Sequence, residues 1–225
     1  MHRSLFKVVL ATTAFAFIHS LLASRAAKDA AANWFGRRNR NGLYRPFYLI
    51  QSVLSLAILT TYLWRLPDKV LYQARGLPAF LLRLGQAAGL IYAFNTAYQV
   101  GISEILGWKS YTAWMRRSKN VPPEPEAQGP GLGENGLLKI TGPFRWSRHP
   151  LNFAPIPVFW LNPRMTLKLA VFTLATSLYL VLGSIHEEIR LRAAYGNRYT
   201  IYQHSGVPFY LPLPVQTGSQ RGQIE

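Results

Sequence analysis

The stretch MTLKLAVFTLATSLYLVLGSI, residues 165–185, is apolar or neutral at every position except Lys168. About 20 such residues in a helix span the hydrocarbon core of a bilayer. A spanning chain must satisfy its own backbone hydrogen bonds, and a helix does so. The stretch therefore predicts an all-α protein, built as a polytopic membrane helical bundle.

Four more apolar runs accompany this helix. Residues 5–24, 46–64 and 84–106 are each long enough to span a bilayer. Residues 151–161 are too few for a straight crossing and contain two prolines, which lack backbone donors. We interpret them as the kinked first arm of a C-terminal hairpin. The prediction is about five membrane segments.

The N-terminal run begins beside basic residues, as a signal peptide does, but no convincing cleavage site follows before Arg25. We interpret it as a retained helix. The whole chain is then expected to be one membrane-embedded domain, residues 1–225. Its parts are a three-helix region at 1–106, a cytosolic loop at 107–135, a hairpin and catalytic tail at 136–214, and a flexible tail at 215–225.

The composition excludes several function classes. The 25 Lys and Arg against 9 Asp and Glu give a net charge of +16, and the mean hydropathy is +0.06. Because the cations flank apolar runs, anionic lipid is the expected partner, and nucleic acid is not. The absence of cysteine excludes thiolate metal sites and cysteine nucleophiles. No Gly-x-Gly-x-x-Gly motif follows a strand pattern, which argues against a soluble Rossmann-type enzyme.

The distribution of cations predicts the orientation of the chain. With the N-terminus outside, 17 of the 25 Lys and Arg residues fall on the cytoplasmic side. We therefore expect an integral, multi-pass protein of the bacterial inner membrane with its C-terminus in the cytoplasm. Both polar segments that flank the last hairpin would face the cytosol.

The segment KITGPFRWSRHPLN, residues 139–152, has the densest set of reactive side chains. One interpretation is an interfacial anchor, in which Arg145, Trp146 and Arg148 lie at the level of the lipid headgroups. The other is a cofactor site, because an aromatic face suits a base and a cation suits a carboxylate.

Glu187 and Glu188 are adjacent acids at the end of the last membrane helix. Ion pairs on the helix surface with Arg190 and Arg192 could explain them. A functional role is the alternative, because acids at a membrane are costly unless they are paired or used.

A histidine inside a membrane helix, such as His19, is a functional candidate, and a hydrogen-bonded structural histidine is equally common. His19, His149, His186 and His204 could also ligate haem or a metal. Their spacing matches no ligand motif, and we predict no metal site.

Read together, the segments TGPFRWSRHP (141–150), Glu187-Glu188, YGNRYTIY (195–202) and Val207-Pro208 resemble the isoprenylcysteine carboxyl methyltransferase-like family of membrane methyltransferases. The resemblance extends over residues 138–214. The helix with His19 and the helix start at Tyr44-Arg45 are more similar to the nurim-like and methanethiol S-methyltransferase branch.

The resemblance implies an integral membrane methyltransferase that uses S-adenosylmethionine and acts on a small thiol, a lipid or another lipophilic acceptor. The catalytic residues that it implies are Glu187, Glu188 and His19. The cofactor-binding residues that it implies are Lys139, Phe144, Arg148, His149, Pro150, Leu151, Asn152, Glu188 and Tyr202.

Two departures leave the acceptor open. Asn152 stands where the family often has tyrosine, and Gly183 stands near the place of an arginine that prenylcysteine enzymes use. The alternatives are a nurim-like protein without methyltransferase activity, such as a haem-binding isomerase or a nitrogen-oxide-linked protein, and a structural or sensory membrane protein. The sequence does not give the oligomeric state.

Overall fold

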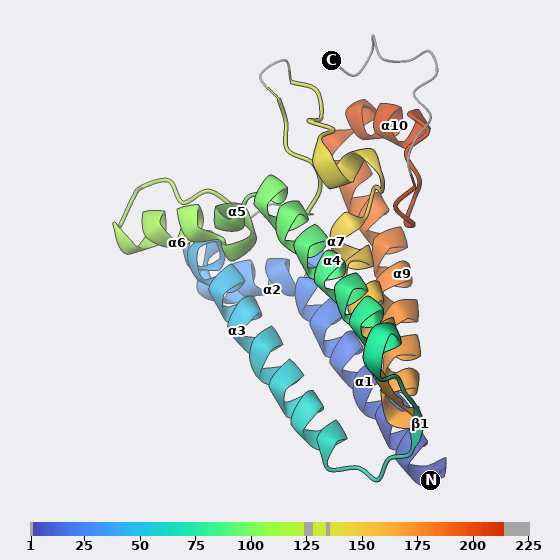
Figure 1. Cartoon of the computed structure of the whole chain (residues 1–225). Coiled ribbons are helices and arrows are strands. Elements are labelled where there is room, and N and C mark those ends of the chain that lie inside the picture. Colours follow the sequence, from blue (N-terminus) through green and yellow to red (C-terminus); the bar gives the residue numbers. More distant parts are fainter. Residues whose placement is uncertain (1, 124–127, 134–135, 214–225) are drawn as a thin grey trace. The chain divides into compact units, whose positions relative to one another are not determined.

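Four helices are long and apolar enough to cross a membrane, within the part of the chain that the structure describes. They are α1 (His2–Ala23), α3 (Arg37–Trp64), α4 (Gly76–Val100) and α9 (Leu167–Tyr195) (Figure 1). The structure is a computed structural model that describes residues 2–123, 128–133 and 136–213, so the expected flexible tail lies outside it. The predicted all-α, polytopic membrane fold is confirmed.

The expected fifth segment, the kinked first arm of the hairpin, is divided into two short pieces. Residues 151–161 lie in two short helices, α7 (Pro150–Phe153) and α8 (Pro155–Trp160), neither of which is long enough to span a bilayer. Pro150 and Pro155 open these helices, where a missing backbone donor is tolerated, and Pro155 thereby separates them. The turn that follows is stabilised by Asn162 Oδ1, which accepts a hydrogen bond from the Arg164 backbone N–H at 3.0 Å.

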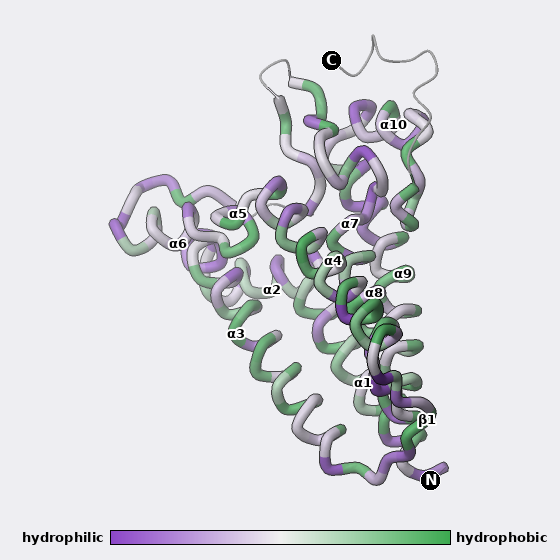
Figure 2. The backbone as a smooth tube through the Cα atoms, viewed as in Figure 1, coloured by the Kyte–Doolittle hydropathy of each residue, from purple (hydrophilic) through white to green (hydrophobic). Residues whose placement is uncertain are grey.

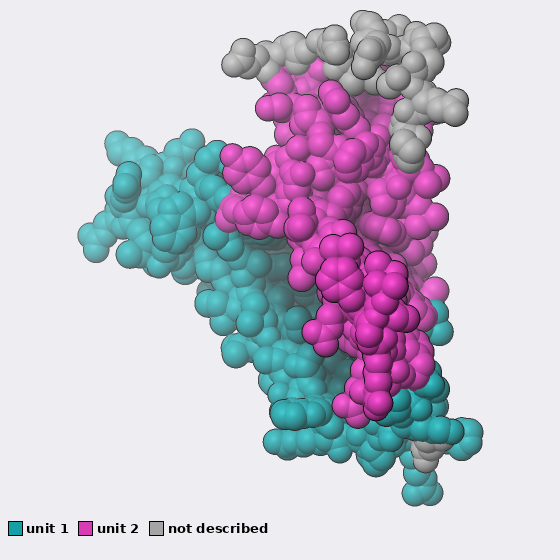
Figure 3. All heavy atoms as spheres, viewed as in Figure 1, with its two compact units in different colours: residues 1–71, 103–125, 166–176 teal, residues 72–102, 126–165, 177–225 magenta. Residues whose placement is uncertain are grey.

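The chain divides into two compact units, drawn in different colours in Figure 3. The predicted single domain stays a prediction. The first unit comprises residues 1–71, 103–125 and 166–176, and the second unit comprises residues 72–102, 126–165 and 177–225.

The first unit is built around α3, which packs against α1, α2 (Arg25–Phe35) and α6 (Trp108–Met115). Its apolar core contains Val8, Leu59 and Leu63. The Ser24 hydroxyl caps α2 by accepting from the Ala27 backbone N–H at 3.2 Å. Helix α6 lies in the segment that was expected to be a loop, and α5 (Ile102–Leu106) precedes it.

The close approach of the Trp114 side chain to the α3 backbone at Gly42 fixes α6 on α3. A Cβ atom on Gly42 would overlap the Trp114 side chain, so only glycine permits this contact. Asn39 Oδ1 accepts a hydrogen bond from Trp114 Nε1 at 2.9 Å. The polar start of α3 and the C-terminal end of α6 therefore lie together.

In the second unit, α4 packs against α7, α8 and the short 3₁₀ helix η1 (Gly142–Arg145). A separate core contains Leu138, Leu191, Tyr199, Tyr202 and Val207. Two short strands, β1 (Val70–Gln73) and β2 (Arg164–Thr166), form a two-stranded sheet, and each strand has residues in both units.

The C-terminal end of α9 leads into α10 (Asn197–His204) through Gly196. Gly196 has φ 59° and ψ −135°, a conformation that side-chain-bearing residues avoid. This turn brings α10 back toward α9, and Figure 2 shows that both segments are largely hydrophilic there, whereas the middle of α9 is hydrophobic. Polar side chains therefore gather at this end of the second unit.

Candidate active site

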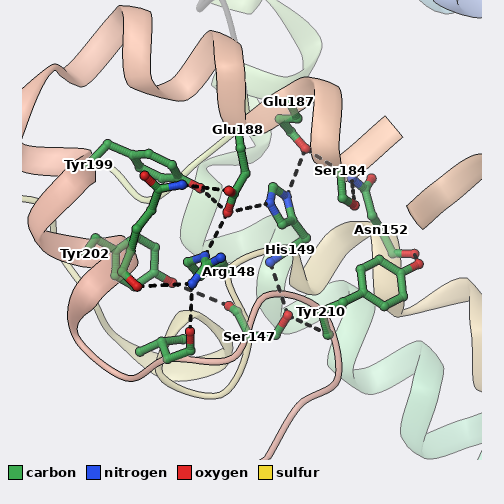
Figure 4. Close-up of polar contacts among 12 residues, drawn as sticks. Ser147, Arg148, His149, Asn152, Ser184, Glu187, Glu188, Tyr199, Tyr202 and Tyr210 are labelled. Carbon is green, nitrogen blue, oxygen red and sulfur yellow. Dashed lines mark hydrogen bonds and ion pairs between the residues drawn. The ribbon is translucent and has the colours of Figure 1, made fainter. Parts of the chain in front are cut away.

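The candidate site lies where residues 147–152 meet the end of α9 and α10, all within the second unit (Figure 4). His149 precedes the first turn of α7, and Pro150 at the next position fixes the chain for helix entry. The Ser147 hydroxyl accepts from the His149 backbone N–H at 3.1 Å and donates to the Tyr210 carbonyl at 2.7 Å. The backbone around His149 is therefore held from both sides.

A buried ion pair joins Arg148 and Glu188. Arg148 Nε donates to Glu188 Oε1 at 2.8 Å, and the two side chains are 14% and 10% exposed. Arg148 Nη1 also donates to the carbonyls of Gln203 and Val207 at 3.3 and 3.1 Å. Buried charges are tolerated when they are paired and hydrogen-bonded in this way.

Two residues of α10 donate further hydrogen bonds to the Glu188 carboxylate. Its Oε2 accepts from Gln203 Nε2 at 2.6 Å, and its Oε1 accepts from the Tyr199 hydroxyl at 3.3 Å. Arg192, one turn further along α9, lies 4.0 Å from Oε2 and is largely exposed. The main partner of Glu188 is thus Arg148, forty positions earlier in the sequence, and the helix-surface pair is secondary.

His149 lies between the two carboxylates. Its Nδ1 is 3.4 Å from Glu187 Oε2 and its Nε2 is 3.4 Å from Glu188 Oε1, with only 1% of the side chain exposed. Burial alone would lower the pKa of His149, but the nearby carboxylates of Glu187 and Glu188 outweigh burial and raise that pKa above 6.5. The site therefore favours a charged imidazole.

The second carboxylate, Glu187, has a different set of partners. Asn152 Nδ2 donates to Glu187 Oε2 at 3.0 Å and to the Ser184 hydroxyl at 2.9 Å. The Gln128 backbone N–H donates to Glu187 Oε1 at 3.1 Å. The amide of Asn152 thus orients Glu187 from the first turn of the hairpin.

The C-terminal strap, residues 205–213, lies against residues 146–152. Pro208 and Tyr210 accept from Arg148 and Ser147, and the Tyr210 hydroxyl donates to the Asn152 carbonyl at 2.8 Å. The Phe209 ring packs edge-on against the His149 ring at 5.1 Å between centroids and lies 5.7 Å from the Arg148 guanidinium carbon. The strap covers the charged cluster with aromatic side chains.

Two predicted cofactor residues lie in the core beside this cluster. Phe144 is 1% exposed, and its carbonyl accepts from the Tyr202 hydroxyl at 2.6 Å. Burial raises the pKa of Tyr202, so the phenol stays neutral. Pro150 is buried, Leu151 is half-buried, and Lys139 is exposed with its backbone N–H bonded to Gly131.

His19, the third predicted catalytic residue, belongs to the first unit. Its Nε2 is 2.6 Å from the Tyr48 hydroxyl and its Nδ1 is 3.1 Å from the Ser52 hydroxyl, both on α3. The Arg45 guanidinium lies on the Tyr48 ring, with 5.6 Å from its central carbon to the ring centroid. Hydroxyl groups thus engage both nitrogens of this imidazole.

Several residues of the cluster were not predicted from the sequence. Gln203, Tyr199 and Ser184 contact the two glutamates or Asn152, and Phe209 and Tyr210 come from the strap. One signal was present, because Tyr199, Tyr202 and Gln203 have the spacing of one helix face. The strap contacts depend on long-range packing that no local pattern reveals.

No family model and no solved structure matches the chain significantly. Methanethiol S-methyltransferase 2 of Bradyrhizobium diazoefficiens is 27% identical over 204 residues, which cover 91% of this chain and 71% of the relative. The methanethiol S-methyltransferase of Mycobacterium tuberculosis is 28% identical over 203 residues, covering 89% of this chain and 75% of the relative. The chain is thus similar to methanethiol S-methyltransferases over most of its length.

The methanethiol S-methyltransferase of Pseudomonas deceptionensis is 27% identical over 222 residues, which cover 94% of this chain and 74% of the relative. An alignment of this length includes both units as well as the motif segments. The similarity confirms the predicted methyltransferase branch and the predicted class of enzyme, a methyltransferase with membrane-spanning helices.

Proposed function

We propose that the protein transfers a methyl group from S-adenosylmethionine to a small thiol, at the charged cluster of the second unit. The observation that carries this proposal is the buried imidazole of His149. Its Nε2 has no hydrogen-bond partner among the described residues, although it lies 3.4 Å from a carboxylate oxygen. A buried polar atom without a partner is costly, and a ligand that accepts its hydrogen bond would remove that cost.

The polar groups of the cluster fit the chemistry of this cofactor. Glu187 suits its ammonium, its ribose hydroxyls or its positive sulfonium, while His149 suits its carboxylate. Phe209 offers an aromatic face beside these groups. Bound there, the cofactor would supply an electrophilic methyl group. Asn152 and the Arg148–Glu188 pair would hold the side chains around it in place.

The proposed acceptor follows from the relatives, which are named for methanethiol. A thiol loses its proton and forms a carbon–sulfur bond, which yields a thioether and S-adenosylhomocysteine. Because the thiolate is the reactive form, the enzyme must remove that proton. We assign proton removal to Glu187, with His149 as its partner, and keep His19 as an alternative base.

Orientation accounts for the rest of the proposed catalysis. The ion pair between Arg148 and Glu188 connects the segment before α7 with α9, and Gln203 adds α10, so the carboxylates keep fixed positions. The strap excludes water from the cluster, which strengthens the electrostatic interactions inside it. Holding two reactants in line supplies a large part of the rate in such transfers.

We also propose that the N-terminus lies outside and that the candidate site faces the cytoplasm. The distribution of Lys and Arg supports this orientation, with 17 of 25 on one side. The cofactor is a soluble cytosolic molecule, so this orientation gives it direct access.

Calorimetric titration of the detergent-solubilised protein with S-adenosylhomocysteine tests the cofactor. Folded protein that shows no binding would overturn the proposal. The acceptor is tested by incubation with S-adenosylmethionine carrying a labelled methyl group and with methanethiol, followed by gas chromatography of dimethyl sulfide. Binding of the cofactor product without methylation of any small thiol would retain the donor and reject the acceptor.

A further inference from the structure

We propose that the basic end of the first unit, formed by Arg37, Arg38, Arg116, Arg117 and Lys119, binds the headgroup of an anionic phospholipid. These five side chains are exposed and come from two places that the fold brings together, the start of α3 and the end of α6. The proposal is independent of the methyltransferase chemistry.

The contact between the two helices places the cations side by side. Arg38 Nη2 donates to the Trp114 carbonyl at 3.0 Å, two positions before Arg116. Asn41 Nδ2 donates to the Val121 carbonyl at 2.8 Å, two positions after Lys119. Like charges that are gathered in this way repel one another, so a bound anion stabilises the arrangement.

The described acids do not neutralise this end. Glu104 pairs with Lys109, and Asp68 lies after the opposite end of α3, where it faces Lys168. Asp29 on α2 is the remaining acid among the described residues of the first unit. Positive charge is thus in excess where α3 begins.

The backbone conformation of Arg117 supports the proposed headgroup site independently of the charge distribution. Arg117 has φ 55°, a left-handed conformation at the position after a helix where glycine is strongly favoured. The Ser118 backbone N–H bonds back to the Ala113 carbonyl at 3.0 Å, which closes the turn. An arginine held in this conformation costs conformational energy, which indicates that its charge is used.

Exposed aromatic side chains flank the cations. Trp34 and Phe35 at the end of α2, shortly before Arg37 in the sequence, are 79% and 65% exposed. Tryptophan beside arginine and lysine is typical of the level of lipid headgroups. A phospholipid matches both features, because its phosphate suits the guanidinium groups and its acyl chains suit the rings.

Native mass spectrometry of the detergent-solubilised protein, titrated with phosphatidylglycerol and with phosphatidylcholine, tests the proposal. We expect the first individual phosphatidylglycerol to bind at least tenfold more tightly than phosphatidylcholine, with the difference lost in high salt. The variant with Arg37, Arg116, Arg117 and Lys119 changed to Gln should lose this preference. Its circular dichroism spectrum and its elution as a single species in detergent should match those of the wild type, which shows that it folds.

A matched control changes four exposed cations at the other end of the same unit, Arg3, Lys7, Arg65 and Lys69, to Gln. The contact of Val8 with Leu63 places these two helix ends together. The control should keep the preference for phosphatidylglycerol. Equal loss in both variants would overturn the proposal, because diffuse charge would then explain the binding. Tighter binding of a short RNA than of the lipid would also overturn it.

The Arg117→Gly variant distinguishes the effect of losing the charge from the effect of destabilising the fold. Glycine relieves the left-handed conformation, so the melting temperature should rise while phosphatidylglycerol binds about fivefold more weakly. An unchanged lipid affinity in this more stable variant would contradict a role for Arg117.

Discussion

Each unit holds a histidine with both ring nitrogens close to oxygen atoms, but the oxygens differ, and so does the burial: His149 is buried and His19 is half-buried. His19 in the first unit meets the hydroxyls of Tyr48 and Ser52, whereas His149 in the second unit meets the carboxylates of Glu187 and Glu188. Hydroxyl groups can satisfy a neutral imidazole, with one donating and one accepting. Carboxylates only accept, and they favour the charged ring. The comparison distinguishes a hydrogen-bonded helix contact from a charged cluster that can hold a ligand.

The largest effect is expected for Glu188→Ala. This change leaves the buried Arg148 guanidinium without its carboxylate, which destabilises a protein by about 3–5 kcal/mol. The melting temperature in detergent should fall sharply, and binding of S-adenosylhomocysteine should be lost. Glu188→Gln keeps the shape and should recover part of the stability. A wild-type melting temperature in Glu188→Ala would mean that the ion pair does not hold α9 and α10 to the hairpin.

His149→Asn should weaken binding of S-adenosylhomocysteine by about 10- to 100-fold, because hydrogen bonds with charged groups contribute about 1.5–3 kcal/mol. Calorimetry measures the affinity directly. The matched change in the first unit, His19→Asn, is the control and should leave the affinity within twofold. Equal losses in both variants would remove the distinction between the two histidines.

The pH dependence should follow His149. Its pKa is raised in the folded protein, so the stability that the charged ring contributes is complete below pH 6.5 and is lost as the pH rises through the raised pKa. We expect the melting temperature to fall over that range on the alkaline side of pH 6.5. The His149→Asn variant should lack this component of the profile, and a profile identical to the wild type would refute the assignment.

Asn152→Ala should weaken the binding of S-adenosylhomocysteine moderately. It removes the hydrogen bonds to Glu187 and Ser184, at about 1 kcal/mol for each, which corresponds to roughly a five- to thirtyfold weaker affinity for the cofactor product. Calorimetry again gives the affinity, and thermal unfolding shows whether the loss reflects folding. Asn152→Asp, which places a third carboxylate beside Glu187, should weaken binding further. Stronger binding by that variant would show that Asn152 does not serve to orient Glu187.

The smallest effect on the donor is expected for His19→Ala, with affinity for S-adenosylhomocysteine within about twofold of the wild type. Loss of two hydrogen bonds to hydroxyls should cost about 1–2 kcal/mol of stability. The informative measurement is thiol turnover at saturating donor. A tenfold or greater loss would assign His19 to the acceptor, whereas unchanged turnover would make it a structural residue.

Much of the fold was predictable because membrane helices are encoded locally. An apolar run has to become a helix in a bilayer, so the four long helices follow from composition. Their ends were less predictable: α4 stops at Gly101, which has φ 97°, although the apolar run continues to Leu106. Helix α6 was missed because its eight residues bury mainly Ser110 and depend on contact with α3.

The motif segments of the candidate site were visible in the sequence, and their partners were not. The sequence left two interpretations of Glu187 and Glu188 open, surface pairs with Arg190 and Arg192 or a functional role, because helix spacing relates only near neighbours. The contacts to Arg148 and His149 depend on how the hairpin returns, forty positions later. Phe209 and Tyr210 carry no motif, and only the path of the strap places them on the cluster.

The separation of Arg148 from its partners has a consequence for synthesis. The ribosome delivers Arg148 forty residues before Glu188, and the carbonyls of Gln203 and Val207 follow later still. During that interval the cation has none of these partners, so it must stay in water or among headgroups while α9 inserts. The cluster can close only after the residues up to Tyr210 have left the ribosome, so its assembly follows the synthesis of α9.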